Sequence, residues 1–405
     1  MEKPLIELLK LFINPFASMK VLMVLDHEFP PDIRVENEIQ ALTKSGIEVH
    51  IACLTFANKD AFEIIKTYKV HRKQISNLLH KTSVGALRFP FYFNFWRKFL
   101  NNILSKEKFD AIHAHDLPMA QPAYEMAQKY NLKFTLDLHE NWPALLRVAT
   151  HTQSVMGKFL SKNSQWEKYE LKYCKLADNV IVVVDEAKER LDNLGINKEK
   201  IQIVSNTLNI EDFNIPEEKP DKDYISVLYA GGINKHRGLQ TVIKGLKFVE
   251  NIDKKIRVWI LGTGSYVEDL KQLAIDEEVE DKVFFEGWKN YQEMQIYFGK
   301  SDICLVPHIK SDHTDSTIPH KIFQYMYAGK PMLVSNCDPL QRIIEESEAG
   351  EVFTFDDSKD FASKLQKVVS NTFYFSEPFI KRSKKLVLEK YNWKIDSAKL
   401  VTIYN

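Results

Sequence analysis

Short apolar runs alternate with amphipathic stretches along this chain. Residues 20–25 (KVLMVL) form an unbroken apolar run, and residues 33–44 repeat apolar positions at helical spacing. A second apolar run, 48–54, completes a strand–helix–strand unit. This order predicts a doubly wound α/β sheet, which binds its ligands beyond the carboxyl ends of the strands. The loop 26–34 is therefore the first candidate site.

The same pattern continues up to a charged linker and starts again beyond it. Before the linker, the apolar runs predict strands at 110–113, 133–138, 178–184 and 201–204, and a helix at 185–194. Beyond it they predict strands at 225–230, 257–262, 283–286, 303–307 and 332–334, and a helix at 239–246. The predicted organisation is an extension (1–18), a first domain (19–207), a linker (208–224), a second domain (225–385) and a final segment (386–405).

The stretch 312–334 has several features of a ligand site. A polar loop leads to Pro319, apolar residues follow at helical spacing, and Gly329 ends the predicted helix. A helix N-terminus attracts a phosphate, and Lys321 in the first turn is unfavourable unless an anion binds beside it. One turn later, Gln324 is placed to reach a sugar hydroxyl. The alternative is an ordinary surface helix.

A glycine turn predicts a second phosphate contact. Gly231 and Gly232 follow the strand at 225–230 and precede the helix at 239–246. A strand, a glycine turn and a helix in this order form a phosphate cradle. Arg237 stands in the same loop.

The stretch 319–331 resembles the donor-nucleotide segment of retaining glycosyltransferases of family GT4, which have the GT-B fold. The matching positions are Pro319, Lys321, Phe323, Tyr325, Met326, Gly329, Lys330 and Pro331. The chain departs from the family where a Glu-x7-Glu pair is replaced by Ser316 and Gln324. The resemblance covers residues 19–405. It implies an α/β GT-B architecture, with two Rossmann-like doubly wound domains facing a central cleft and a C-terminal helix that crosses back to the first domain.

The resemblance also implies roles for individual residues. His139 would contact the donor sugar, and Arg237 would pair with the donor diphosphate. Together with Lys321 they form the implied catalytic set. Backbone groups at Gly287 and Trp288 would hold the nucleobase. The full implied donor set is Gly231, Gly232, Arg237, Gly287, Trp288, Ser316, Pro319, His320, Lys321 and Gln324.

Three residues are predicted on the acceptor side. Arg34 follows the D-x-R-V pattern of a subset of the family and would pair with a phosphate; a surface ion pair with Glu36 or Glu38 is the open alternative. Asp116 and Glu140 follow predicted strands and are expected near His139.

Two patterns suggestive of metal binding are not taken as sites. We interpret His115 as a hydrogen-bonded loop histidine, because the histidines lack the spacing of a ligand pair on one helix. The D-x-D pattern at 221–223 falls in the charged linker. No metal site is predicted.

The implied function is transfer of a sugar, with retention, from a nucleotide-diphosphate sugar to a hydroxyl acceptor in polysaccharide or glycolipid assembly. The donor would be a UDP- or GDP-sugar, and no cofactor is expected. Two alternatives stay open: a sugar-nucleotide epimerase on the same fold, and a nucleotide-sugar-binding protein without activity. The acceptor, the sugar, the base and the oligomeric state do not follow from the sequence.

Composition excludes some classes of protein and favours a cytoplasmic location. The 405 residues carry equal numbers of basic and acidic side chains, 55 of each, so no global charge points to nucleic acid. The four cysteines are far apart and are expected to be reduced and buried. No apolar run reaches the ~20 residues of a membrane span. Residues 1–18 are interpreted as an extension, a short amphipathic helix or a misassigned start, not a signal peptide.

One region departs from this balance. Residues 59–108 carry eleven basic and three acidic side chains, and they include the aromatic segment RFPFYFNFWRKF at 88–99. Aromatic rings among basic residues suit the headgroup layer of a bilayer. The alternative is that the aromatics fill the core while the lysines are solvated. Contact of 84–99 with the anionic inner leaflet, or with a lipid-linked acceptor, is therefore one of two open interpretations.

Overall fold

The computed structural model describes residues 19–57, 59–148, 161–215, 218, 220–250 and 252–405. The predicted extension, 1–18, lies outside them. The chain divides into two compact units. The first comprises the described residues of Met1–Leu138 and Met156–Ile181 together with Ser397–Asn405; the second comprises those of His139–Val155 and Val182–Asp396.

An eight-stranded sheet has the order β3-β4-β2-β1-β5-β6-β7-β8. The pairings of β1 with β2 and β5, of β2 with β4, and of β5 with β6 are parallel, as predicted for a doubly wound sheet. The antiparallel hairpin of β3 and β4 was not predicted, because the side chains of β3 are largely exposed and show no alternation. The strands are β1 (Lys20–Glu28), β2 (Glu48–Thr55), β3 (Phe62–Ile65), β4 (Tyr68–Gln74), β5 (Ala111–His115), β6 (Lys133–Leu138), β7 (Asn179–Val182) and β8 (Ile201–Ile203).

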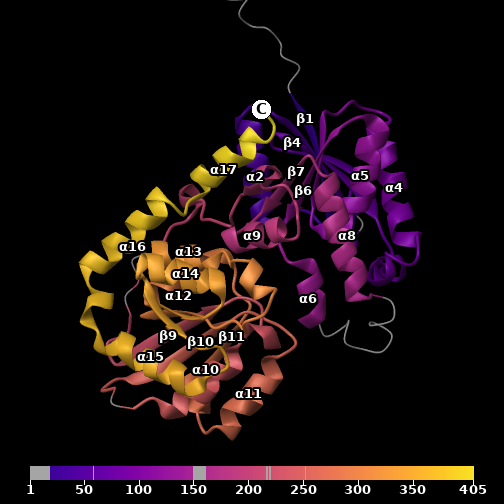
Figure 1. Ribbon diagram of the computed structural model, residues 1–405. Helices are drawn as coiled ribbons and strands as arrows, with labels where there is room; N and C mark the ends of the chain where they lie inside the picture. The colour runs from indigo at the N-terminus through magenta and orange to yellow at the C-terminus, as the bar shows by residue number, and fades with distance from the viewer. Residues whose placement is uncertain (1–18, 58, 149–160, 216–217, 219, 251) are drawn as a thin grey trace, which may run out of the picture. The chain divides into compact units, whose positions relative to one another are not determined.

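Helices in the first half of the chain follow the strands closely. Asp32 caps α2 by accepting a hydrogen bond from the Val35 amide at 3.1 Å. Helix α5 packs against β5 and β6, and α4 and α8 pack against α5 (Figure 1). The helices are α2 (Ile33–Lys44), α3 (Asn77–Lys81), α4 (Phe91–Leu104), α5 (Ala120–Tyr130), α6 (Trp142–Val148), α8 (Asn163–Leu176) and α9 (Asp185–Asn193).

The aromatic segment at 88–99 divides between core and surface. Tyr92, Phe93 and Trp96 are buried on the inner face of α4. Phe89 and Phe91 remain exposed, by 45% and 59%. The core interpretation is therefore correct for the first three residues, since helical spacing places them on one buried face of α4, and it is wrong for the other two.

The second sheet has six strands in the order β11-β10-β9-β12-β13-β14, all paired in parallel. The strands are β9 (Tyr224–Ala230), β10 (Lys255–Leu261), β11 (Val283–Gly287), β12 (Ile303–Val306), β13 (Met332–Ser335) and β14 (Gly350–Phe353). The helices are α10 (Leu239–Gly245), α11 (Val267–Asp276), α12 (Tyr291–Lys300), α13 (Lys321–Tyr327), α14 (Asp338–Ser347), α15 (Ser358–Ser370), α16 (Glu377–Glu389) and α17 (Trp393–Thr402).

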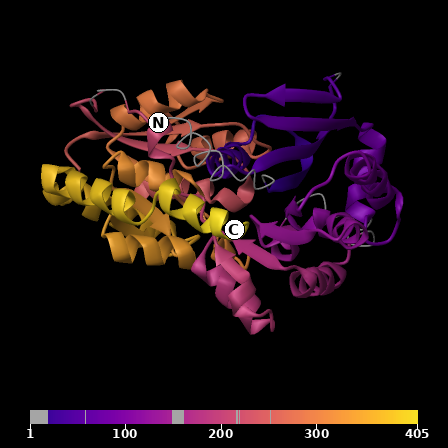
Figure 2. The same cartoon turned by 90° about the horizontal axis from the view of Figure 1, so that it is seen from above.

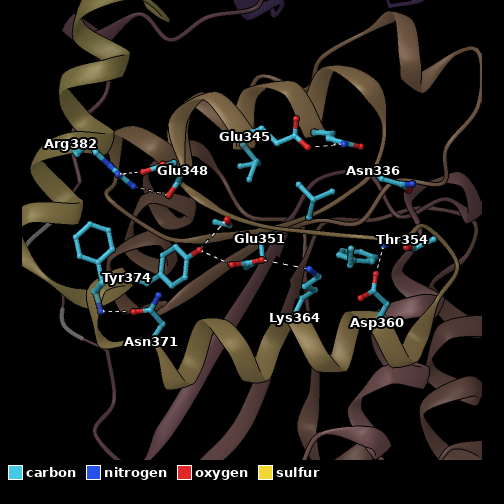
Figure 3. Close-up of a pocket in the computed structure, with 16 residues that line it drawn as sticks. Asn336, Glu345, Glu348, Glu351, Thr354, Asp360, Lys364, Asn371, Tyr374 and Arg382 are labelled. Atoms are coloured by element: carbon cyan, nitrogen blue, oxygen red, sulfur yellow. Dashed lines mark hydrogen bonds and ion pairs between the residues drawn. The ribbon is translucent and has the colours of Figure 1, made fainter.

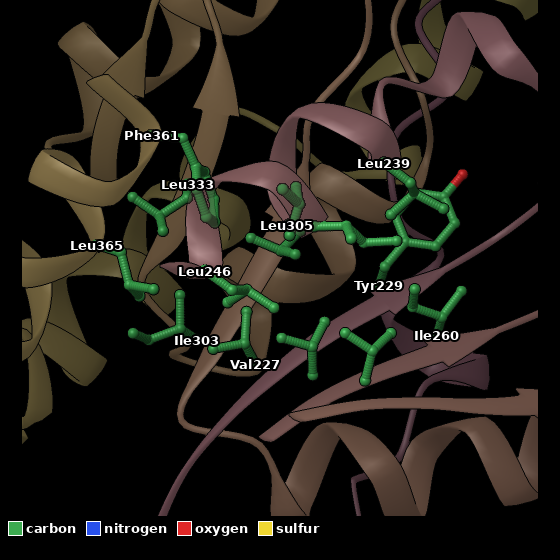
Figure 4. Close-up of a cluster of buried hydrophobic side chains, with 14 of the residues drawn as sticks. Val227, Tyr229, Leu239, Leu246, Ile260, Ile303, Leu305, Leu333, Phe361 and Leu365 are labelled. Carbon is green, nitrogen blue, oxygen red and sulfur yellow. The ribbon is translucent and has the colours of Figure 1, made fainter. Parts of the chain in front are cut away.

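The core of the second unit joins its central strands to α10 and α15 (Figure 4). Val227 and Ile303 belong to the neighbouring strands β9 and β12, and Leu246 and Phe361 cover them from the helices. Burial of these apolar side chains fixes β9 and β12 side by side. The loops that leave the carboxyl ends of these two strands are consequently held close together.

The end of the chain is fixed at two places. Helix α16, yellow in Figure 2, packs against α13 within the second unit. In the first unit, the Tyr404 hydroxyl lies 2.8 Å from Nδ1 of His113. The four cysteines are free and buried, as expected. Among the described residues, no helix is long and apolar enough to cross a membrane.

Candidate functional site

The glycine turn after β9 is packed as tightly as a ligand cradle requires. Gly231 has φ +146°, and a Cβ there would lie 3.2 Å from Nζ of Lys321. Gly238 has φ +73°, and a Cβ there would lie 1.7 Å from the carbonyl oxygen of Pro307. The positive φ disfavours a side chain at Gly231, and the Pro307 carbonyl excludes one at Gly238, so the turn lies directly against the segment that follows β12.

Lys321 points into this turn and has neutral partners. Its Nζ donates to the carbonyl oxygen of Ala230 at 3.0 Å and lies 3.9 Å from the ring centre of Tyr229. Burial, and next the positive charge of Arg237, hold the pKa of Lys321 well below its usual value. An anion bound beside Lys321 would stabilise the charged ammonium, as the sequence predicted.

Arg237 is surrounded by three histidines. Its NH1 lies 3.2 Å from Nε2 of His308. His236 lies directly before Arg237 in the short helical turn Lys235–Arg237. Its ring centre lies 6.4 Å from that of His313. Burial, followed by neighbouring positive charges, lowers the pKa of His236 and of His313 to about 4 and that of His308 well below 6.5. Lys321, Arg237 and three imidazoles with lowered pKa values thus share one region. A bound anion there would offset the positive charge of the two basic side chains.

The loop after β6 is tied to the predicted donor segment. Thr317 donates to the backbone carbonyl of His139 at 3.2 Å. The Asn141 side chain donates to the Asp312 carbonyl at 3.2 Å and to the Ser316 hydroxyl at 3.4 Å. His139 is therefore held beside the loop that precedes α13, within the second unit.

Ser316 and Glu140 take part in this attachment. The Ser316 hydroxyl donates to the Asp312 carbonyl at 2.8 Å, and the residue is buried. Glu140, predicted on the acceptor side, lies 3.0 Å from Nε2 of His313 through its carboxylate. Both side chains are engaged in holding loops together.

The beginning of α13 differs from the prediction. The helix starts at Lys321 with His320 as its cap, so Pro319 precedes the first turn. The amides of Ile322 and Phe323 donate to the carbonyls of Pro319 and His320, each at 3.2 Å. These two amides are bonded within the turn and are not open donors as we had expected. His320 Nδ1 lies 2.8 Å from the carbonyl oxygen of Asn206.

The other predicted donor residues lie on α13, in the turn after β9 and at the end of β11. Gln324 is 4% exposed, in the buried face of α13. Gly232 accepts a hydrogen bond from the Tyr229 hydroxyl at 2.7 Å. Gly287 ends β11 and accepts from the Gly262 amide at 2.7 Å, and the next side chain, Trp288, is 71% exposed. An exposed indole at this position is available to a flat ligand.

Arg34 lies in a buried ion-pair network of the first unit. Its NH2 donates to both carboxylate oxygens of Asp137, at 3.1 and 2.9 Å, and its Nε lies 3.1 Å from the Glu38 carboxylate. Burial lowers the pKa of Arg34, but the two carboxylates outweigh it and raise the pKa. The ion pair with Glu38 was the open alternative, although it is buried here and not on the surface. The guanidinium is paired with the carboxylates of Asp137 and Glu38, whereas we expected it to pair with a phosphate.

His113 and His115 complete this network. One ligand atom from each of Glu38, His113, His115 and Asp137 lies within 4.8 Å of the others. These are ligand types that zinc accepts. The Arg34 guanidinium, however, already supplies a positive charge to both carboxylates. Asp116 follows β5 with φ +65°, and its amide donates to the Asp137 carbonyl at 2.8 Å.

Two family models match successive parts of the chain. The model described as "Glycosyltransferase Family 4" matches residues 33–212, and "Glycosyl transferases group 1" matches residues 210–386. The chain belongs to the family 4, or group 1, glycosyltransferases.

Curated relatives of this glycosyltransferase are distant. The amylovoran biosynthesis glycosyltransferase AmsK of Erwinia amylovora is 23% identical over 52% of the chain, and the O-antigen chain mannosyltransferase RfbU of Salmonella typhimurium is 25% identical over 53%. The matches span 53% and 55% of these relatives, so the chain matches about half of their length.

Solved structures are similar over nearly the whole glycosyltransferase chain. Sucrose-phosphate synthase from Thermosynechococcus elongatus has a TM-score of 0.77 at 16% identity, covering 96% of this chain and 98% of that one. Anabaena HepE in complex with UDP-glucose has a TM-score of 0.69 at 12% identity, covering 96% and 99%. At such identities the likeness shows the fold alone, and that fold is GT-B, as the resemblance implied.

A cavity of about 720 Å³ lies in another part of the second unit, beside the edge strand β14 (Figure 3). Its charged groups are engaged by neighbouring side chains or backbone amides. Glu351 accepts from the Tyr374 hydroxyl at 3.0 Å and lies 3.7 Å from Lys364, while Arg382 pairs with Glu348. None of the predicted donor residues lines this cavity. We therefore do not assign the donor to it.

Several residues of these two clusters, one in each unit, were missed from the sequence. His236, His308 and His313 follow no spacing rule, and they meet only because the loops after β9 and β12 are neighbours. Glu38 was named only as a partner of Arg34, one helical turn away. Asp137 is the penultimate residue of the strand β6. An acidic side chain inside this apolar run was the signal that could have identified it.

Proposed function

We propose that this protein is a retaining glycosyltransferase that moves a sugar from a nucleotide-diphosphate sugar to a hydroxyl of a carbohydrate or lipid-linked acceptor. The observation that carries the proposal is the electropositive cluster around Lys321 and Arg237. Its buried ammonium has neutral partners, and the adjacent imidazoles have lowered pKa values. A diphosphate is the anion that the matched family would place there.

The proposed chemistry uses this cluster to stabilise the leaving group. As the bond between sugar and diphosphate breaks, negative charge grows on the diphosphate, and Arg237 and Lys321 are placed to stabilise it. The acceptor hydroxyl would approach on the leaving-group face and give its proton to the departing phosphate. His139 would orient the sugar, because its carbonyl is fixed by Thr317 beside the donor segment.

The donor is proposed to carry UDP or GDP. The HepE structure contains UDP-glucose, whereas the name of RfbU specifies a mannosyl group and no base. These two proteins therefore do not decide between UDP and GDP. The proposed contacts are Gln324 to ribose hydroxyls, and Gly287 and Trp288 to the base. By the matched relatives, polysaccharide or lipopolysaccharide assembly is the proposed setting, at the cytoplasmic side of a membrane. The aromatic segment at 84–99 is proposed to meet that membrane.

A nucleotide-sugar-binding protein without transfer activity is the second candidate. The observation that favours it is Ser316, which stands where the family has a carboxylate and whose hydroxyl already bonds Asp312. Both candidates predict that nucleotide sugars stabilise the fold by mass action.

One experiment separates the two candidates. A thermal-shift screen against UDP- and GDP-sugars identifies the donor, and release of the nucleoside diphosphate is then followed with and without extracts that contain acceptors. Binding with acceptor-dependent release supports the transferase. Binding without release under any acceptor supports the binding protein, and no binding by any nucleotide sugar contradicts both.

A further inference from the structure

A second cavity, of about 470 Å³, lies wholly within the first unit. It is formed by the segment before α4, by α4 itself, by the start of α5 and by one side of α8. Four basic side chains line it: Arg88, Arg97, Lys168 and Lys172. Among the described residues that line it, none is acidic. We call it the basic–aromatic pocket.

The basic side chains come from two helices that are distant in sequence. Lys168 and Lys172 are exposed and stand one turn apart on α8, so they face the same side. Lys172 Nζ lies 5.0 Å from the ring centre of Tyr173. Arg97 is oriented by Glu125, which accepts from its NH2 at 2.8 Å. Glu125 offsets the charge of Arg97, while the exposed Lys168 and Lys172 give the pocket a positive charge that is complementary to a phosphate.

The floor of the basic–aromatic pocket is rigid and apolar. Tyr169 is buried, and its hydroxyl accepts from the Gln121 amide at 2.8 Å. The ring of Tyr169 stacks on Phe93 at 6.2 Å with an interplanar angle of 21°. A buried aromatic floor beneath exposed lysines suits a ligand that has both a charged group and an apolar part.

The rim of the pocket exposes large apolar side chains. Phe89 lines the pocket, and its ring stacks on that of Phe91 at 6.4 Å. These rings are 45% and 59% exposed. Exposed aromatic rings next to cations are favoured at the boundary between lipid headgroups and acyl chains. A single rounded pocket is a poor fit to a nucleic acid, whose backbone needs an extended basic groove.

We propose that the basic–aromatic pocket binds the phosphate of an anionic phospholipid headgroup, while Phe89 and Phe91 enter the apolar boundary of the bilayer. The proposal deepens the proposed function, on which it rests, by naming the partner of the 84–99 segment and by adding α8 to it. The pocket opens beside the start of α5, the helix that follows β5 and Asp116. Docking there would bring the strand ends of the first unit to the membrane from which a lipid-linked acceptor is taken.

The test is flotation of the full-length chain with vesicles of phosphatidylcholine alone and of phosphatidylcholine with phosphatidylglycerol. We expect binding to the anionic vesicles that weakens with salt. Lys168→Gln with Lys172→Gln should reduce the partition coefficient by about 25-fold, because each basic residue near such a surface contributes a factor of about five. Phe89→Ser with Phe91→Ser should also reduce the partition coefficient, and this reduction should persist at low salt.

The matched control is Lys381→Gln with Lys385→Gln, which removes two exposed lysines at the same spacing from α16. This pair should float like the unaltered chain. Equal flotation of the α8 variant and the control would overturn the proposal. Glycerol phosphate is tested separately; if it raises the melting temperature of the unaltered chain but not of the α8 variant while neither vesicle floats the chain, the pocket is a site for free phosphate esters and membrane docking is wrong. Loss of single-stranded RNA binding without loss of flotation in the α8 variant would also overturn it.

The thermal shift by nucleotide sugars is recorded on the same preparations. A chain that responds to a nucleotide sugar but floats with neither vesicle refutes the docking and leaves the transferase. A chain that floats but responds to no nucleotide sugar refutes the proposed function and leaves the docking.

Discussion

The Arg237 guanidinium lies 3.2 Å from the ring of His308, NH1 to Nε2. A neutral imidazole can accept a hydrogen bond from arginine, whereas a protonated one cannot, so this contact requires His308 to be uncharged. Burial and Arg237 itself hold the pKa of His308 low enough for that. The guanidinium is thereby oriented without using an acid, and its charge remains available to an anion.

Replacing either cation should impair transfer strongly. We expect Arg237→Ala and Lys321→Ala each to raise the barrier by about 3 kcal/mol, because each would stabilise charge on the leaving diphosphate. Single-turnover kinetics with a nucleotide sugar and an acceptor measure this. Lys330→Ala is an unsuitable control, since its Nζ bonds the carbonyls of Gly299 and Ser301. Lys381→Ala, on exposed α16, is suitable. Normal turnover of both site variants would remove the diphosphate assignment.

The histidines of the same cluster predict an acid-sensitive fold. Burial lowers the pKa of His236 and His313 to about 4, below the value of about 6.5 for an unfolded chain. The unfolded chain therefore binds protons that the folded chain does not. The stability that these two residues contribute is complete above about pH 6.5 and is lost as the pH falls toward 4.

We expect the melting temperature to fall over that window, and His236→Gln with His313→Gln to reduce the slope. The slope should not vanish, because burial also lowers the pKa of His71 to about 4. A bound nucleoside diphosphate should flatten the curve as well, since its negative charge raises the pKa of the nearby imidazoles. Identical slopes with and without these histidines would contradict the assignment.

The buried network of Arg34 predicts a large stability effect in the first unit. Asp137→Asn removes the charge that accepts two hydrogen bonds from Arg34. Breaking a buried ion pair from one side leaves an uncompensated charge, and we expect a loss of about 3–5 kcal/mol in the free energy of unfolding. Urea denaturation measures it. Asp312→Asn is the control, because this exposed acid forms an ion pair with the exposed Arg147, and such a surface pair contributes little to stability. A loss below 1 kcal/mol for Asp137→Asn would argue against the network.

The order of strands explains how much of this could be predicted from the sequence. Apolar runs identified most strands of both sheets, and parallel pairing brings their carboxyl ends to one edge. Gly231 and Lys321 are far apart in sequence, yet β9 and β12 are neighbours, so their following loops meet. The resemblance supplied the residues, and the strand order supplied their proximity.

Side-chain contacts without a period could not be predicted in this way. Glu38 is buried in a helix that also exposes Glu36, and the helical pattern does not say which acid turns inward. Lys168 and Lys172 lie on α8, whereas the basic region identified in the sequence spans residues 59–108. Tertiary packing joins the two regions, and a sequence window cannot.

Restoring the family's carboxylate at Gln324 tests its proposed contact with ribose. Gln324→Glu should keep or improve nucleotide affinity in calorimetry, because a carboxylate accepts hydrogen bonds from sugar hydroxyls more strongly than an amide does. The unliganded protein should melt at a lower temperature, since the site is 4% exposed and a buried charge is costly without a partner. A clear loss of affinity would refute the ribose role.

The division of the aromatic segment predicts opposite results for two neighbouring residues. Trp96 is fully buried and contacts Tyr92 and Phe99, so Trp96→Ser should cost about 3–5 kcal/mol in the free energy of unfolding. Phe91 is 59% exposed, and Phe91→Ser should change the stability by less than about 0.5 kcal/mol. Urea denaturation of the two variants measures both. If membrane contact depends on exposed rings, Phe91→Ser should weaken vesicle flotation while leaving the melting temperature unchanged, whereas a destabilised Phe91→Ser variant would show that this ring belongs to the core.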